Sequence, residues 1–429
     1  MKKVLLLLLF TIPLFVNGQK VDRLINERDV ARLIRTLSAD DMLGRSALAP
    51  VGIERAAAFI EGEFKAIGLT PLPGLSSFRQ SFEKERVTLR QADVRLDGQP
   101  VPSSQLMVIT DLDSLVLDAG LAVREIGKDK NFFRFFGGFL QDTTRKIVLV
   151  DSSHAASFQR AQAYYSRARL LDGPAKPGAT IFVLGRTGTT LAGTIRQNRT
   201  KLVLSNIVGQ LPGRSRPNEQ VVFSGHYDHI GILPAVAGDS IANGADDDAS
   251  GVTAVISLAR YFQKLQTNER TLIFVAFTAE EIGGYGSQYF SRQLDPAGVV
   301  AMFNIEMIGK ESKFGKNNAF ITGYEKSDFG AILQKNLTDT PFKFYPDPYP
   351  DQNLFYRSDN ATLARLGVPA HTISTDQIDI DKFYHTVDDE LETLDVANIT
   401  TTIRAIALSA RSIVNGTDTP TRVDTKQLR

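Results

Sequence analysis

The chain has 429 residues, a length that predicts either two units or one large domain with an insert. Hydrophobic residues make up 43% and charged residues 23%, which excludes a chain that is disordered throughout. The formal net charge is only +1, so nothing in it favours nucleic acid or an anionic membrane as a partner. Because the sequence has no cysteine, it cannot form disulfides, and any metal site must use His and carboxylate ligands.

The N-terminus has the pattern of a secretory signal. Two lysines precede an apolar run, Val4–Val16, and the small residue Gly18 follows it. This order predicts a signal peptide at residues 1–18 and export of the chain to the periplasm or the extracellular space. The run is shorter than the roughly 20 residues that span a bilayer, so we expect no stable membrane anchor.

The next part of the chain predicts helices followed by an insert. Between residues 52 and 69 the apolar side chains recur at helical spacing, and we assign residues 19–90 to the start of a catalytic domain. Residues 91–202 contain short apolar runs among polar turns, for example 146–150 and 180–184. This pattern predicts an inserted β-rich domain.

From residue 203 to residue 418 the pattern is that of an α/β domain. Compact apolar runs read as buried parallel strands, and a segment with helical periodicity at 250–265 lies between the first two. The four runs are 221–224, 272–278, 299–305 and 368–374. We expect an α/β fold, a three-layer sandwich around a mainly parallel sheet, completed by residues 19–90. Residues 419–429 are predicted to be a polar tail.

Chemically active side chains fall where these strands end. Ligands of open α/β sheets bind beyond the carboxyl ends of the strands, so these residues should meet at one edge. In chain order they are His226 and Asp228, then Asp246, Asp247 and Asp248 before the helix, then Glu280 and Glu281, Glu306, and His385 in a loop after the last strand.

Burying so many carboxylates together is unfavourable unless cations neutralise them. Zinc accepts His and carboxylate ligands, and two zinc ions that share a carboxylate can act together on one substrate. Each piece also has a simpler interpretation: a solvated turn at Glu280 and Glu281, a helix cap at Asp248, a surface residue at His385. Their joint order at strand ends favours a site with two zinc ions. His154, His229 and His371 are interpreted as structural.

The same segments resemble the dinuclear zinc aminopeptidases, with relatives such as aminopeptidase S, aminopeptidase Y and glutamate carboxypeptidase II. The matching pieces are His226-Tyr227-Asp228, Gly244 to Gly251, Phe277 to Glu281 with Gly286-Ser287, and Tyr384-His385-Thr386. Asn304 to Gly309 and Arg357-Ser358-Asp359 match less fully, and Gly44-Arg45 lies in a segment that resembles the N-terminal helices of the family. The insert resembles a protease-associated domain.

The resemblance implies a role for each candidate. Asp247 would bridge two zinc ions, and the remaining ligands would be His226, Glu281, Glu306 and His385. Glu280 would be the general base that activates the metal-bound water. Asp228 would orient His226, Asp248 would support the ligands from behind, and the Asp247–Asp248 peptide bond would be cis.

Two positions depart from the family pattern. Glu306 replaces the more usual Asp, and Asn360 stands where a His often follows Ser-Asp, so Asn360 is given no role. The predicted function is hydrolysis of N-terminal residues from peptides. A carboxypeptidase on the same site and a catalytically lapsed binding protein remain alternatives. A cyclase-like transferase is disfavoured, because those relatives lack an equivalent of His226.

Overall fold

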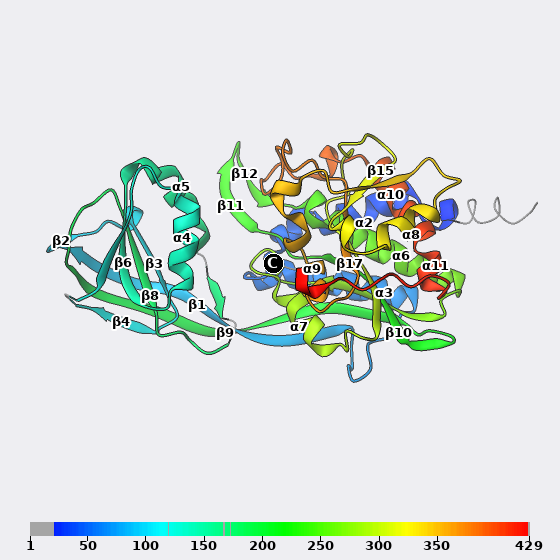
Figure 1. Ribbon diagram of the computed structural model, residues 1–429, viewed down its shortest axis with the longest axis horizontal. Helices are drawn as coiled ribbons and strands as arrows, with labels where there is room; N and C mark the ends of the chain where they lie inside the picture. The colour runs from blue at the N-terminus through cyan, green and yellow to red at the C-terminus, as the bar shows by residue number, and fades with distance from the viewer. Residues whose placement is uncertain (1–20, 119, 166–167, 172, 428–429) are drawn as a thin grey trace, which may run out of the picture. The chain divides into compact units, whose positions relative to one another are not determined.

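The computed structural model describes residues 21–118, 120–165, 168–171 and 173–427 (Figure 1). The predicted signal peptide therefore lies outside the described residues. The chain forms two compact units: residues 1–82 with 204–429 make unit 1, and residues 83–203 make unit 2. Whereas the sequence analysis placed the boundaries after residues 90 and 202, the units divide inside two long strands, β1 (Arg79–Leu96) and β9 (Leu191–Leu211).

Unit 1 is a mixed α/β unit. Its further strands are β10 (Arg216–His226), β11 (Gly231–Val236), β12 (Asp239–Ala242), β13 (Arg270–Phe277), β14 (Val299–Ile305), β15 (Asn318–Ile321), β16 (Lys343–Pro346) and β17 (Ala370–Ser374). Its helices are α2 (Glu27–Leu37), α3 (Pro50–Ile67), α6 (Gly251–Leu265), α7 (Tyr285–Gln293), α8 (Phe329–Lys335), α9 (Asn360–Ala364), α10 (Val396–Ser409) and α11 (Arg411–Val414).

The sheet of unit 1 is mainly parallel at its centre, as predicted. β10 pairs in parallel with β13 on one side and β14 on the other, and β17 continues the parallel order beyond β14. β9 and β15 flank these four strands in antiparallel orientation. The four apolar runs of the sequence analysis thus form four neighbouring parallel strands.

Helices cover both faces of this sheet. Because side chains alternate along each strand, neighbouring residues of one strand pack against opposite helix layers. Phe223 of β10 belongs to the core that includes α2, α3, α6 and α10, whereas its neighbour Val222 packs with residues of α7 and α9. Both side chains are fully buried. The predicted three-layer sandwich is confirmed, and it explains why the strands read as unbroken apolar runs.

Unit 2 has its own sheet and more helix than the sequence predicted. Its strands besides β1 and β9 are β2 (Gln99–Pro100), β3 (Leu106–Thr110), β4 (Ser114–Leu117), β5 (Ala122–Ile126), β6 (Arg145–Val150), β7 (Arg169–Leu171) and β8 (Ala179–Leu184). β5, β6 and β8 are parallel, with β3 antiparallel beside β8. Two helices, α4 (Phe132–Gln141) and α5 (Ala155–Tyr165), bury aromatic residues against the sheet.

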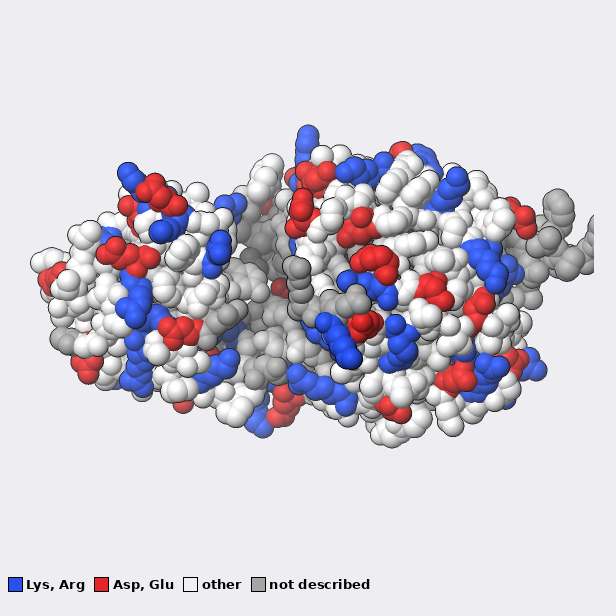
Figure 2. All heavy atoms as spheres, viewed as in Figure 1, with Lys and Arg blue, Asp and Glu red and all other residues white. Residues whose placement is uncertain are grey.

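The C-terminal segment, the surface charges and the length of the helices complete the description. Val423, within the segment predicted as a polar tail, is 4% exposed and hydrogen-bonds to Gly367, so that part of the segment packs on unit 1. Figure 2 shows acidic and basic side chains interspersed over the visible face, as expected for a net charge of +1. Among the described residues, no helix combines the length and the apolar character needed to cross a bilayer.

Candidate metal centre

Predicted site residues lie at and beyond the ends of three parallel strands, and five of the predicted residues line one pocket. His226 is the last residue of β10, Glu280 and Glu281 follow β13, and Glu306 follows β14 directly. The pocket is lined by Asp247, Glu280, Glu281, Glu306 and His385, together with Met307, Phe320, Thr322, Leu354, Arg357, Ser358, Thr372, Ser374, Asp376, Ile378 and Tyr384. The pocket therefore combines a charged wall with an apolar and hydroxyl-bearing one.

Asp247 lies between two groups of possible ligands. Its Oδ1 is 3.1 Å from His226 Nε2, which is 4.0 Å from Glu306 Oε1. Its Oδ2 is 3.2 Å from His385 Nε2, which is 3.0 Å from Glu281 Oε2. One oxygen of Asp247 thus faces each group, the arrangement that a carboxylate shared by two ions requires.

The residues around Asp247 are held by backbone hydrogen bonds. Asp248 accepts from the N–H groups of His226 and Met307 and so ties β10 to the segment after β14. Asp389 accepts from the N–H of Asp247 and was not identified from the sequence. It follows His385 by only four positions, and no spacing rule distinguishes it from neighbouring acids. The Asp247–Asp248 peptide bond is cis, as the resemblance predicts.

Asp228 acts on the site in a different way from the one predicted. His226 Nδ1 contacts the backbone oxygen of Asp228 at 3.1 Å, whereas the carboxylate of Asp228 lies 4.0 Å away. That carboxylate accepts instead from the N–H of Glu280 at 3.0 Å and from the N–H of Glu281 at 3.4 Å. Asp228 thus orients His226 through its main chain and fixes the segment that carries the proposed base.

Arg45 supports the same loops from the N-terminal segment. Its fully buried guanidinium donates to the backbone oxygens of Tyr227, Asn243 and Gly244, on both sides of the site. A buried cation among acidic groups also balances part of their charge. The sequence indicated Gly44-Arg45 only through the family resemblance. No pattern in it shows that an arginine so far away in the chain reaches these carbonyl groups.

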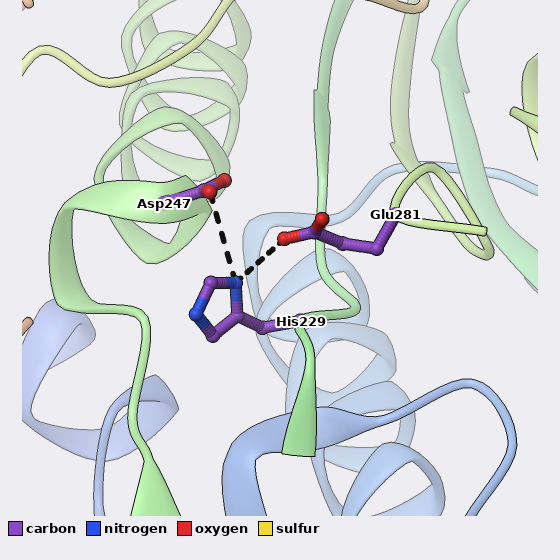
Figure 3. A group of neighbouring side chains, drawn as sticks. All are labelled: His229, Asp247 and Glu281. Atoms are coloured by element: carbon purple, nitrogen blue, oxygen red, sulfur yellow. Dashed lines mark hydrogen bonds and ion pairs between the residues drawn. The ribbon is translucent and has the colours of Figure 1, made fainter. Parts of the chain in front are cut away.

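His229 is the main correction to the sequence analysis. It was interpreted as structural, yet its Nδ1 lies 2.7 Å from Glu281 Oε1 and 3.8 Å from Asp247 Oδ2 (Figure 3). The three residues form a group that can hold a metal ion. The signal was its place directly after His226-Tyr227-Asp228, but adjacency alone does not show which way an imidazole points.

The charge state of the cluster reflects an excess of carboxylates. Burial raises the pKa of Glu280 well above its usual range and that of Glu306 to about 7. Burial also opposes ionisation of Asp247, but contacts with His226 and His385 outweigh it and hold the pKa of Asp247 well below its usual value. The pKa of His385 is raised to about 10, because its contacts with Asp247 and Glu281 outweigh its burial. Asp247, which contacts these two imidazoles, thus has a lowered pKa, whereas Glu280 and Glu306 have raised pKa values.

These residues fit zinc ions. Within the described part of the chain, Glu306 Oε2 is buried and has no hydrogen-bond partner, which is unfavourable unless a cation binds there. His226 Nε2 is also buried and faces carboxylate oxygens, Asp247 Oδ1 at 3.1 Å and Glu306 Oε1 at 4.0 Å. Ligands bonded at about 2.0 Å to a tetrahedral zinc ion lie about 3.3 Å apart. The 3.0–3.2 Å separations around Asp247 and His385 are close to this value. His and carboxylate are also the ligand types that zinc accepts.

Asn360, a departure from the family pattern, and Arg357 have different surroundings. Asn360 is fully buried and donates to the backbone oxygens of Phe355 and Ala370, while it accepts from Thr372. It therefore ties α9 to β17 and stays outside the pocket wall. Arg357, from the segment Arg357-Ser358-Asp359, lines the pocket.

The fold and this His–carboxylate cluster define the class, a metallopeptidase-like α/β protein. More particularly, residues 206–410 match the model of Peptidase family M28. The match covers the strands β10, β13, β14 and β17 and every predicted ligand.

Similar proteins have names that fit this match, zinc metalloprotease and leucine aminopeptidase. Over 113 residues the chain is 34% identical to a probable zinc metalloprotease of Pyrenophora teres f. teres. This alignment covers 26% of this chain and 23% of that protein. Over 205 residues the chain is 28% identical to leucine aminopeptidase 1 of Penicillium rubens, covering 44% and 51%. The chain thus spans at most about half of these relatives.

Solved structures share the fold. An aminopeptidase from Aneurinibacillus sp. strain AM-1 superimposes with a TM-score of 0.61 at 17% identity, covering 92% of this chain and 95% of the other. A zinc aminopeptidase from Bacillus subtilis gives a TM-score of 0.59 at 15% identity, covering 92% and 97%.

Proposed function

We propose that this protein is an exported aminopeptidase that binds two zinc ions and uses Glu280 as its general base. The observation that carries the proposal is one pocket that holds a partly buried Glu280 beside the four candidate ligands Asp247, Glu281, Glu306 and His385. The fifth ligand, His226, lies behind Asp247. The names of the similar proteins, zinc metalloprotease and aminopeptidase, support the same class of reaction.

Zinc, when bound, polarises the scissile carbonyl and promotes ionisation of water. Glu280 then takes a proton from the attacking water at its carboxylate and returns it to the leaving nitrogen. Its N–H is held by Asp228, which fixes the start of the side chain. A buried carboxyl with a raised pKa is suited to this exchange, because it can hold the proton between the two transfers.

Glu306 is the residue that we assign to the substrate amine. Its side chain is 20% exposed, against 3% for Asp247 and 6% for Glu281, so among these acids it is the most open to the pocket. A free N-terminus is cationic or metal-binding, and a carboxylate at the pocket attracts it. The apolar wall formed by Met307, Phe320 and Ile378 would receive the first side chain of the peptide.

The comparison of a free peptide with its N-acetylated form tests this assignment. We expect the free peptide to be cleaved at least about a hundredfold faster, because acetylation removes the amine that Glu306 would bind. A chelator should abolish cleavage of both, and added zinc should restore it. Equal rates for the two forms would contradict an aminopeptidase, and a zinc-loaded protein without turnover would favour a lapsed binding protein.

A carboxypeptidase is the second candidate, because Arg357 lines the pocket and could pair with a terminal carboxylate. Arg357→Gln separates the two functions. An aminopeptidase should keep its kcat/KM within about threefold, whereas a carboxypeptidase should lose most of its activity. Lys382, a second basic residue near the motif loops, is not among the described residues that line the pocket.

The proposal of export rests on the order of basic, apolar and small residues before Gln19. N-terminal sequencing of protein from the native host should find a chain that begins near Gln19. Recovery of the chain with Met1 from the cytoplasm would contradict export and would leave the enzymatic proposal unaffected.

A further inference from the structure

We propose that His229 is a positioning residue for one of the two zinc ions: its Nδ1–H binds one oxygen of Glu281 and leaves only the other oxygen free for the ion. The inference rests on the proposed function only through the zinc ions. It goes beyond the ligand set, because it assigns a role to an imidazole that lies behind the ligands.

The two oxygens of Glu281 have different neighbours. Oε2 faces His385 Nε2 at 3.0 Å, on the side of Asp247, whereas Oε1 lies 2.7 Å from His229 Nδ1 (Figure 3). A carboxylate with both oxygens free can bind one ion through either or both. With Oε1 engaged by His229, Glu281 offers a single oxygen in a fixed direction.

The contact between His229 and Glu281 is a hydrogen bond rather than shared ligation of one ion. A distance of 2.7 Å is typical of a hydrogen bond to a carboxylate, whereas two tetrahedral zinc ligands lie about 3.3 Å apart. His229 Nδ1 is also 3.8 Å from Asp247 Oδ2, farther than His385 Nε2 is at 3.2 Å. His385 is therefore the better placed ligand, and His229 supports Glu281.

The imidazole of His229 cannot turn away from Glu281. Its side chain is fully buried, and its backbone N–H donates to the oxygen of Arg45. A Cβ atom at Gly244 would come within 2.6 Å of the ring, so the absence of a side chain at Gly244 makes room for it. Among residues 21–118, 120–165, 168–171 and 173–427, His229 Nε2 has no hydrogen-bond partner, and the polar contacts of the ring there are those at Nδ1.

A preorganised ligand binds its ion more tightly, because less freedom is lost on binding. Outer partners of metal ligands change metal affinity by about 10–100-fold when they are removed. We therefore expect the loss of His229 to weaken one zinc ion and to leave the ion beside His226 and Glu306 unchanged.

Zinc titration of the metal-free protein, read with a competing chromophoric chelator, tests the inference with two variants. His229→Phe keeps a ring and removes the donor, and one of the two dissociation constants should rise by about 10–100-fold. His229→Asn places an amide N–H near the position of Nδ1 and should recover most of that loss. His371→Phe is the matched control, since His371 is equally buried, is not itself among the pocket-lining residues, and bonds to Ser327 and to the backbone oxygen of Thr322.

Nitrogen NMR of labelled histidine gives a readout that a merely structural role would not affect. In zinc-loaded wild-type protein, His229 should be protonated at Nδ1, and its signal should disappear in His229→Phe. Unchanged zinc constants in His229→Phe would overturn the inference, as would equal losses in the Phe and Asn variants. In either case wild-type protein with two zinc ions would leave the proposed function standing, whereas wild-type protein that binds no zinc would overturn both.

Discussion

Two sheet edges in this molecule have the same topology and different chemistry. In unit 1 the parallel strands β10, β13 and β14 end at partly buried acids and at the buried imidazoles of His226 and His229. In unit 2 the parallel strands β5, β6 and β8 also end at a cavity, whose lining includes Glu125, Asp151 and Arg186.

The polar groups at the edge in unit 2 already have partners or water. Glu125 and Asp151 are exposed, Asp151 caps the backbone N–H of Ser153, and Arg186 donates to Gln105. At the edge in unit 1, the buried Glu306 Oε2 and His229 Nε2 have no hydrogen-bond partner among the residues that the structure describes. The carboxyl edge of a parallel sheet therefore indicates only where a ligand can bind. The buried polar atoms without a hydrogen-bond partner are what indicates a metal ion.

The largest difference between the edges should appear when one carboxylate in each is neutralised. Glu280→Gln should lower kcat by about 10²–10⁴-fold, since general-base catalysis is typically worth this much, and zinc content should stay constant. Glu125→Gln, the matched change in unit 2, should leave kcat and zinc content unchanged. Turnover close to wild type in Glu280→Gln, with normal zinc content, would rule out Glu280 as the base.

A smaller effect should distinguish ligand identity from charge at Glu306. Glu306→Ala should weaken zinc binding at least about tenfold and raise KM for free peptides, because the carboxylate is assigned both to an ion and to the amine. Glu306→Asp restores the commoner family residue and should keep activity while the preference among N-terminal residues shifts. Zinc titration and a panel of aminoacyl substrates measure both effects, and normal zinc affinity in Glu306→Ala would remove Glu306 from the ligand set.

The smallest effect concerns the stability of the metal-free protein. The folded-state pKa values of Glu306, about 7, and Asp389, about 8, are raised by burial above those of the unfolded chain. The folded protein therefore binds more protons between about pH 4 and pH 8, and stability falls as the pH rises through this window. The raised pKa of His385, about 10, has the same sign from about pH 6.5 upward.

Thermal unfolding should accordingly show a melting temperature that falls by on the order of a few degrees from pH 5 to pH 8 without zinc. With saturating zinc the trend should reverse, because the ion needs deprotonated ligands and binds more tightly at higher pH. A metal-free protein whose stability rises over this range would show that these acids are ionised in the fold without a cation.

The fold of unit 1 was predictable because each central strand is buried on both faces and reads as one apolar run. The helices of unit 2 were not predicted. In α4, Phe132 and Phe136 face the core while Phe133 is 50% exposed, so aromatic residues occur on both sides and weaken the helical pattern. In the site, the ends of the strands predicted where His226, Glu280, Glu281 and Glu306 lie, whereas the contact of His229 with Glu281 was not predicted.

The sequence by itself determined which residue types stand at the ends of the strands, because parallel strands buried between helices require continuous apolar runs that stop where polar chemistry begins. It also determined that any metal site must use His and carboxylate ligands, since no cysteine is present. Only the tertiary structure decided which atoms of these residues meet. Asp228 binds the backbone of Glu280, Arg45 reaches across from the N-terminal segment, and His229 turns its ring toward Glu281. Such contacts depend on side-chain direction and on residues far apart in the chain, which no local pattern specifies.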